Sequence, residues 1–223
     1  MKMKNIFTAA LIALSATSVF AQNFEGIIKM SITNAEKSDN AEIVWKMKGD
    51  KSRLEYVGKA GDRSYNYVLL LNNAEAKAKI LTEANGQKVV YTVGIPSSQN
   101  DNVRYVDHIF TSSNKMIDGF LAEQVTLKAA DRRTVCWVSK DSPLTVEMLP
   151  SALKANGVFN YFSIHKIKGV PLEMETIDAS GNVIFSQKIS SIKPVTVNEN
   201  EFTVGSEYAD PNEILKSTPT KTQ

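Results

Sequence analysis

The lone cysteine of the chain, Cys136, lies in the stretch TVCWVSKD and is the first residue whose type could do chemistry. A nucleophilic cysteine needs a nearby base, usually histidine, and a lowered pKa. The chain has two histidines, His108 and His165, and neither lies at a spacing that marks a cysteine–histidine pair. Alternation along the stretch puts Cys136 on one strand face with Thr134 and Val138. We therefore interpret Cys136 as a small buried hydrophobe without a catalytic role.

The two histidines are also the residues that could bind a metal. His108 follows Asp107, but neighbouring residues of a strand point to opposite faces, so these two side chains do not converge. His165 has no second ligand nearby in the chain, and a dedicated site normally needs three or four ligands. The acidic stretch NENE at 198–201 resembles no calcium loop and is interpreted as a solvated turn. We predict neither a metal nor another cofactor.

The sequence contains none of the short motifs that mark common enzymes. There is no Gly-x-Ser-x-Gly elbow, no phosphate-binding P-loop and no dinucleotide-binding fingerprint. A pair of glycosidase carboxylates is assembled only in the folded chain, so this alternative stays open. The pattern as a whole favours a protein that is not an enzyme.

The first 21 residues have the pattern of a secretory signal peptide. Lys2 and Lys4 form a positive start, an apolar stretch follows, and Val19 and Ala21 place small residues before a cleavage point. A transmembrane anchor is the alternative, but the apolar stretch falls short of the ~20 residues that a spanning helix needs, and no later segment is long enough. We therefore expect a periplasmic protein, cleaved near Ala21, that does not span the membrane.

Cleavage near Ala21 also changes the charge of the protein. The whole chain has a formal net charge of +2, and the loss of Lys2 and Lys4 leaves none. No long basic run remains, so nucleic acid is not an expected partner. No linker or repeat interrupts the rest of the chain, which predicts a single domain over 22–210 and a loose polar tail over 211–223.

Hydrophobic and polar residues alternate along many short segments, which is typical of strands with one buried face. Ile43, Trp45 and Met47, for example, share a face opposite Lys46. Turn-rich stretches separate the segments, and we expect about ten antiparallel strands in meander order.

A sheet of this size must twist and curl to cover its apolar face. The predicted fold class is therefore mainly β, with a curved antiparallel sheet or half-open β-barrel and a few short helices. The helices are expected at 149–157, where Gly157 would end the first of them, and at 210–216.

Aromatic and large apolar side chains recur on the apolar faces of these strands. One interpretation is a solid core, and the other is the lining of a hydrophobic cavity inside a curved sheet. The residues that we predict to line such a cavity are Trp45, Tyr56, Tyr67, Leu69 and Trp137.

Several short motifs resemble an uncharacterised family of exported cell-envelope proteins. The first motif runs Lys-x-Ile-x-Gly-aromatic and continues, after a strand and a turn, into Trp-Val-Ser-x-Asp. Its positions here are Lys115, Ile117, Gly119, Phe120, Trp137, Val138, Ser139 and Asp141. Further matches to the family are Phe24, Gly26, Gly169, Pro171, the Ser-Gly-Asn turn at 180–182, Ile192, Phe202 and Tyr208. Many members carry a cysteine near the position of Ala122, so a disulfide used elsewhere is not available in this chain.

The resemblance implies a fold similar to the lipoprotein-sorting carriers (LolA/LolB-like), which hold acyl chains over an apolar cavity. It brings no catalytic residues and no established activity. The leading hypothesis is non-catalytic binding of a hydrophobic or lipid-like ligand in the periplasm. The alternative is a structural or protein-interaction module of the cell envelope with a filled core, whose partner is an envelope protein.

Overall fold

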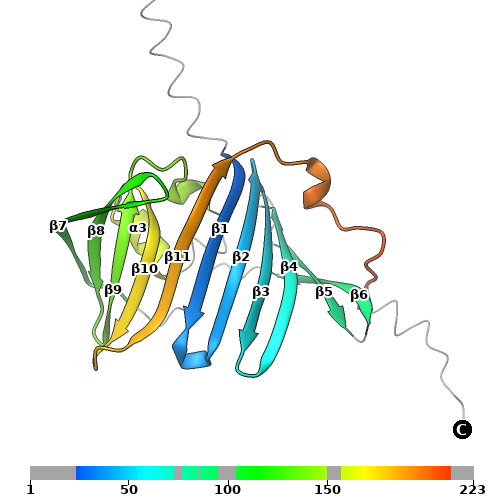
Figure 1. Cartoon of the computed structure of the whole chain (residues 1–223), viewed down its shortest axis with the longest axis horizontal. Coiled ribbons are helices and arrows are strands. Elements are labelled where there is room, and N and C mark those ends of the chain that lie inside the picture. The colour runs from blue at the N-terminus through cyan, green and yellow to red at the C-terminus, as the bar shows by residue number, and fades with distance from the viewer. Residues whose placement is uncertain (1–23, 73–76, 85, 95–103, 150–156, 212–223) are drawn as a thin grey trace, which may run out of the picture.

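The computed structural model describes residues 24–72, 77–84, 86–94, 104–149 and 157–211. The predicted signal peptide and nearly all of the predicted tail lie outside the described residues. Within these residues the strands form one 11-stranded sheet in the order β6-β5-β4-β3-β2-β1-β11-β10-β9-β8-β7 (Figure 1). The strands are β1 (Glu25–Asn34), β2 (Asp39–Lys48), β3 (Lys51–Ala60), β4 (Arg63–Asn72), β5 (Lys77–Ala84), β6 (Gln87–Gly94), β7 (Asp107–Ile117), β8 (Phe120–Lys128), β9 (Arg132–Ser139), β10 (Val170–Asp178) and β11 (Val183–Pro194).

The sheet consists of two meanders joined by the first and last strands. Strands β1 to β6 follow one another, β7 to β11 do the same, and β1 pairs antiparallel with β11. The outermost strands of this order, β6 and β7, do not pair with each other, so the sheet stays open. The predicted fold class, a curved antiparallel sheet that is mainly β, is confirmed. The sequence predicted a simple meander, and it did not reveal the β1–β11 junction.

The hydrophobic alternation of the sequence corresponds to two distinct faces of the sheet. Ile28, Trp45, Leu54 and Leu69 are direct neighbours across β1, β2, β3 and β4, and the first three are almost fully buried. We call the face that carries them the inner face. Because side chains alternate along a strand, residues such as Lys46 and Glu55 lie on the opposite, outer face.

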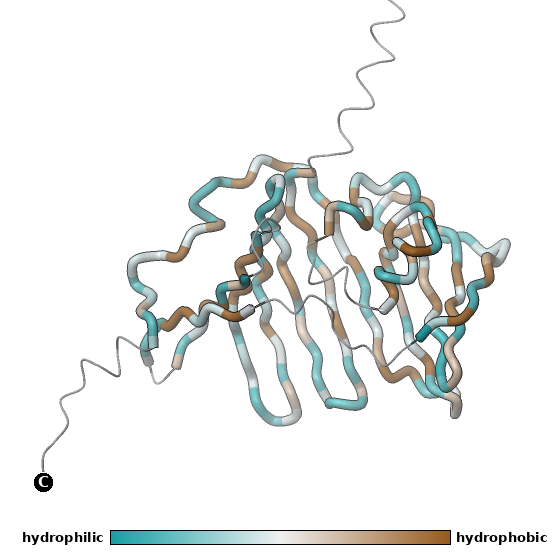
Figure 2. The backbone as a smooth tube through the Cα atoms, turned by 180° about the vertical axis from the view of Figure 1, so that it is seen from behind, coloured by the Kyte–Doolittle hydropathy of each residue, from teal (hydrophilic) through white to brown (hydrophobic). Residues whose placement is uncertain are grey.

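A short helical layer covers part of the inner face. It consists of the 3-10 helix η3 (Val146–Met148) and the α-helix α3 (Gly157–Ile164), which lies behind β9 and β10 in Figure 1 and in front of the sheet in Figure 2. Phe159 and Phe162 of α3 are buried in the core. An isolated helix of this length is marginal in water, so packing against the sheet must stabilise it.

The helix positions expected from the sequence need correction. Gly157 begins α3 and does not end a helix; residues 150–156 of the expected helix lie outside the described residues. Only the start of the second expected helix, at 210–216, is described. Among the described residues, no helix has both the length and the hydropathy needed to cross a membrane.

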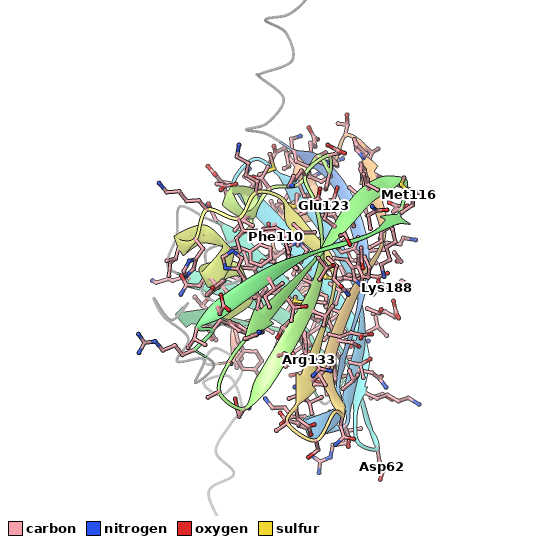
Figure 3. All side chains as sticks on the ribbon, turned by 90° about the vertical axis from the view of Figure 1, so that its left-hand side faces the viewer. Asp62, Phe110, Met116, Glu123, Arg133 and Lys188 are labelled. Carbon is pink, nitrogen blue, oxygen red and sulfur yellow. The ribbon has the colours of Figure 1, made fainter. Side chains whose placement is uncertain are left out.

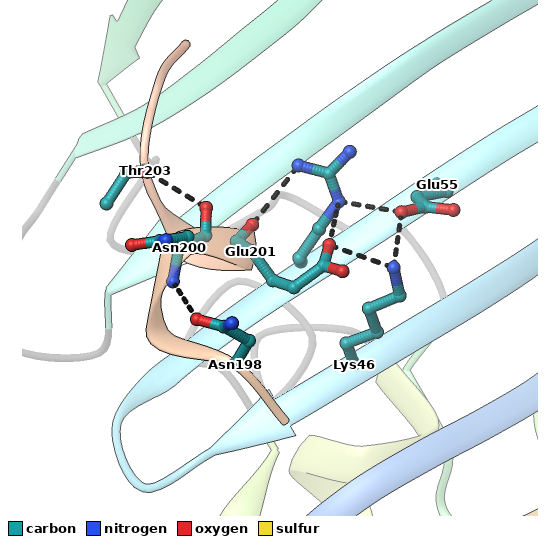
Figure 4. Close-up of polar contacts among 7 residues, drawn as sticks. Lys46, Glu55, Asn198, Asn200, Glu201 and Thr203 are labelled. Carbon is teal, nitrogen blue, oxygen red and sulfur yellow. Dashed lines mark hydrogen bonds and ion pairs between the residues drawn. The ribbon is translucent and has the colours of Figure 1, made fainter. Parts of the chain in front are cut away.

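The segment after β11 returns along the outer face and is fixed there by ion pairs. Glu201, in the 3-10 helix η4 (Glu199–Phe202), pairs with Lys46 at 2.9 Å, and its backbone carbonyl accepts a hydrogen bond from Arg53 (Figure 4). Glu199 of the same helix pairs with Lys51 at 2.6 Å. The stretch 198–201 was predicted to be a solvated turn, and Asn198, Glu199 and Asn200 are indeed exposed. The sequence did not reveal that its two carboxylates meet cations that lie about 150 residues earlier in the chain.

Candidate functional site

An apolar cavity of about 40 Å³ lies between the inner face and the helical layer. Its floor consists of strand residues, and Leu144, Leu149 and Phe159 cover it. The strand residues that line it are Met30, Ile32, Ile43, Trp45, Leu54, Tyr56, Val170, Pro171, Gln187 and Ile189. A water molecule needs roughly 10–15 Å³ of such space, so the cavity holds a few waters at most. As it stands, it is too small for an acyl chain.

One residue that lines this cavity, Trp45, has a buried polar atom without a partner. Trp45 is 2% exposed, and its indole Nε1 makes no hydrogen bond with any described residue. A buried donor without an acceptor costs about 1–3 kcal/mol, and such groups are rare in native proteins. An acceptor supplied by a bound molecule would remove this cost.

Beyond the helical layer, the inner face continues as a row of tyrosines. Tyr56, which lines the cavity, stacks on Tyr67 with ring centroids 4.6 Å apart, and Tyr67 lies 5.8 Å from Tyr65. Burial raises the pKa of Tyr56 above its ordinary value. The Tyr65 hydroxyl donates to Asp39 at 2.6 Å, and desolvation together with this bond raises the pKa of Tyr65 to about 12. The row is neutral at physiological pH and presents partly exposed aromatic surface next to the cavity.

The structure brings four of the five predicted lining residues to one face. Trp45 and Tyr56 line the cavity, Tyr67 stacks on Tyr56, and Leu69 lies beside Leu54 across the β3–β4 pair. Whether these residues bind a ligand stays a prediction.

The fifth predicted residue, Trp137, lies apart from the other four on the outer face. It is opposite Glu173 of β10, and the ammonium of Lys115 lies 4.4 Å from its ring centroid. Lys115 also pairs with Glu173, which Lys188 contacts from β11. Trp137 therefore belongs to a cation–aromatic contact on the outer face. The alternation of side chains along β9 already predicts that Trp137 and Cys136 point to different faces of the sheet. The sequence did not reveal which of these faces is the inner one.

Cys136 lies on the inner face, fully buried, between Val125 of β8 and Met174 of β10. Burial raises the pKa of the Cys136 thiol well above its ordinary value, which disfavours the thiolate that a nucleophile requires. The interpretation of Cys136 as a small buried hydrophobe agrees with this position.

The structure brings the two histidines together, which the sequence did not predict. Their ring centroids lie 5.8 Å apart, His108 on β7 and His165 just after α3. Tyr161 stacks on His165 and shares a hydrogen bond of 3.1 Å with His108. No group of three or more histidine, cysteine, aspartate or glutamate side chains among the described residues is placed to hold a metal ion. The cluster therefore joins α3 to the edge of the sheet.

Comparison with known proteins gives similarity in structure alone. No protein-family model and no curated protein sequence matches the chain. Among solved structures, MucB aligns with a TM-score of 0.47 and 10% identity over 90% of this chain, which spans 64% of the MucB chain. The complex of Pseudomonas aeruginosa MucA/MucB aligns with the same TM-score, at 11% identity over 89% of this chain and 62% of that chain.

Two further structures align over almost their whole length. An uncharacterized conserved protein from Thermus thermophilus has a TM-score of 0.47 and 10% identity, with 90% of this chain and 97% of that chain covered. A putative outer membrane lipoprotein-sorting protein domain from Vibrio parahaemolyticus has a TM-score of 0.31 and 10% identity, with 92% and 97% covered. A domain of the class that the sequence resembles is thus among the similar structures. At TM-scores and identities this low, the likenesses carry no conclusion about activity or ligand.

Proposed function

We propose that this protein is a non-catalytic binding protein that holds a hydrophobic, lipid-like ligand between the inner face of its sheet and the layer of α3 and η3. The observation that carries the proposal is the buried Trp45 Nε1 without a partner, on a residue that lines an apolar cavity. A ligand with an apolar chain and a carbonyl or ester oxygen matches both features, since the chain replaces apolar contacts and the oxygen accepts from the indole.

Binding requires the helical layer to move away from the sheet, because a cavity of about 40 Å³ admits no chain. The side chains that must give way are Leu144, Leu149 and Phe159. A ligand's methylene groups would replace the apolar contacts that these residues lose. Burial of apolar surface stabilises by about 25 cal/mol per Å² whether the ligand or the protein supplies the surface. The net cost of opening is then the loss of those contacts between the layer and the sheet that the ligand does not replace.

The proposed location is the periplasm, and it rests on the signal-peptide pattern of residues 1–21. The envelope of a bacterium supplies free and membrane-bound lipids of the required kind. A protein that carries such molecules between membranes has to shield their chains from water.

Native mass spectrometry of the protein purified from the periplasm that it is exported to tests this function. We expect a bound species of lipid mass at one per chain. Trp45→Phe removes the indole donor and should lower its occupancy, whereas Trp137→Phe, the matched change on the outer face, should leave it unchanged. A ligand-free protein, or equal occupancy in both variants, would contradict the proposal.

The second candidate function is protein association through β7. This strand lies at one edge of the sheet, and its free backbone edge, the one away from β8, pairs with no described strand. Exposed apolar side chains accompany it, among them Phe110 and Met116, which are 50% and 63% exposed (Figure 3). A bare edge with apolar side chains is a template for an added strand.

A second copy of the chain is the partner that fits this edge. An antiparallel β7–β7 pair centred on Thr111 sets Asp107 opposite Lys115 and the exposed Val106 opposite Met116. The register of β7 shifts between Phe110 and Asn114, and such an irregularity bends a strand and limits edge pairing. Sedimentation analysis decides this candidate: we would see a dimer that Met116→Lys dissociates, and a monomer at all concentrations contradicts it.

A further inference from the structure

A second cavity, of about 400 Å³, opens beside the apolar one, between η3 and the end of α3. Three lysines and one glutamate line it together with apolar and hydroxyl side chains. The lining residues are Lys140, Leu144, Thr145, Val146, Glu147, Phe162, Ser163, Lys166, Ile167, Lys168 and Gly169. The cavity is therefore lined by net positive charge above an apolar base, and Phe162 and Ile167 of that base are buried.

The position of Lys166 is unusual for a residue with a side chain. Helix α3 ends in a Schellman motif, in which the Ile167 amide donates to the Phe162 carbonyl at 3.0 Å and the Lys166 amide donates to the Ser163 carbonyl at 3.3 Å. Lys166 has a φ of 53° in this motif, at the position where glycine is usually found because it adopts left-handed backbone without strain. Lys166 thus lines the cavity from a strained backbone position, where glycine would relieve the strain.

The lysines of this cavity differ in how they are paired. Lys140 contacts Glu123 of β8 at 2.6 Å, whereas Lys166 and Lys168 have no ion pair among the described residues. Both are exposed, so their charge is available to a ligand. An anion in the cavity could form charge-assisted hydrogen bonds with these two ammonium groups without displacing an acidic side chain.

The two cavities share the side chain of Leu144, which is 1% exposed and lines both. The positive cavity lies on one side of it and the apolar cavity with Trp45 on the other. Movement of Leu144 would join them into one site that is charged at its mouth and apolar within.

We propose that the cavity beside η3 and α3 binds the anionic headgroup of an amphiphile, with a phosphate ester at Lys166 and Lys168 and its acyl chain passing Leu144 toward Trp45. This inference rests on the proposed function and names its ligand class: an anionic lipid with a single chain. The ester oxygen of such a lipid lies between headgroup and chain, and it meets the Trp45 indole only if the glycerol part of the headgroup passes Leu144 together with the chain.

Calorimetric titration with a matched pair of lipids tests the headgroup. The probes are monododecanoyl glycerol and its phosphate ester, a lysophosphatidic acid with the same chain, both below the concentration of micelle formation. We expect the phosphate ester to bind about tenfold tighter or more, as charge-assisted hydrogen bonds to an anion give. Lys166→Gly and Lys168→Gln should each remove most of this preference and leave the affinity for monododecanoyl glycerol unchanged.

Two controls separate binding from folding and from general charge. Lys166→Gly relieves the backbone strain, so its melting temperature should equal or exceed that of the parent protein. Lys29→Gln removes an exposed lysine on the outer face that has no ion pair among the described residues, and it should keep the full preference.

Each other outcome overturns a definite part of the inference. Equal affinity for the two lipids overturns the headgroup site and leaves the proposed function intact. Binding of glycerol phosphate as tightly as the lipid shows a site for a free anion and overturns the lipid class. No binding of either lipid overturns this inference and the proposed function together.

Discussion

The carboxylate of Asp118 accepts a hydrogen bond of 2.5 Å from the backbone amide of Ile192, 74 residues later in the chain. Asp118 and Gly119 form the turn between β7 and β8, and both have positive φ, 47° and 83°. The β7–β8 hairpin thereby reaches past β9 and β10 to β11. It contacts β11 beyond Lys188, the residue at which the pairing of β11 with β10 ends. The hydrogen bond gives the partly buried Ile192 amide a side-chain acceptor.

Asp118→Ala should therefore destabilise the protein by about 2 kcal/mol, because it removes the acceptor of a partly buried amide and places alanine at positive φ. Asp118→Asn, which tolerates positive φ and keeps an acceptor, should cost less than half as much. Urea unfolding measures both values. Equal and small losses would show that the turn is held by other contacts.

The same turn shows how far sequence patterns predict this protein. The motif Lys-x-Ile-x-Gly-aromatic can be read from the sequence, and three of its four positions have a clear structural role: Lys115 pairs with Glu173, Ile117 is buried, and Gly119 adopts positive φ. Strands were predictable because alternation is a local property of each segment. The partner of Asp118 was not, since it depends on how β8 to β11 are arranged.

Long-range contacts explain the other failures as well. Trp137 was predicted to line the same cavity as Trp45, yet a strand pattern does not tell which of its two faces the rest of the sheet will cover. Glu201 and the histidine pair find their partners only in the folded chain. The order of the strands, with β1 beside β11, likewise has no signal in the local alternation.

The outer-face ion pairs should make stability depend on pH in the acid range. Burial alone would raise the pKa of Glu55, but hydrogen bonds from Arg53 and Lys46 outweigh it and hold the pKa below its ordinary value of 4.5. The pKa of Glu173 is lowered in the same way, by Lys115 and Lys188 against the effect of burial.

A carboxyl whose pKa is lowered on folding stabilises the protein fully above its ordinary pKa and loses this effect as the pH falls through the lowered value. The melting temperature should therefore fall steadily below pH 4.5. Glu55→Gln should flatten this decline. A variant with the same acid slope as the parent would show that Glu55 does not contribute to it.

The C-terminal segment should loosen when its ion pair with β2 is removed. Glu201→Gln breaks the contact with Lys46 and should cost about 1 kcal/mol, since the pair is only partly buried. The reporter is the Val90 amide of β6, which donates to the Ala209 carbonyl at 3.1 Å at the far end of this segment. Its hydrogen exchange should accelerate in Glu201→Gln and stay unchanged in Glu83→Gln, an exposed change on β5. Equal hydrogen exchange in both variants would show that the Glu201–Lys46 ion pair does not hold the C-terminal segment in place.

Cys136 should behave as a structural residue. Cys136→Ala leaves a small cavity and should cost about 1 kcal/mol, and Cys136→Ser should cost more because it buries a hydroxyl in an apolar site. Thiol reagents should react only as fast as the protein opens, since the thiol is fully buried and its pKa is raised. Rapid labelling of the native protein would overturn this assignment.

The central claim, that a lipid-like ligand binds at Trp45, is tested most directly by Trp45 fluorescence. Trp137→Phe leaves Trp45 as the single tryptophan, and this variant is titrated with monododecanoyl glycerol. We expect a saturable change in emission at one ligand per chain, with a stabilisation of about 2.7 kcal/mol at a hundredfold excess over Kd. An emission spectrum and a melting temperature that ignore the lipid at every concentration would contradict it.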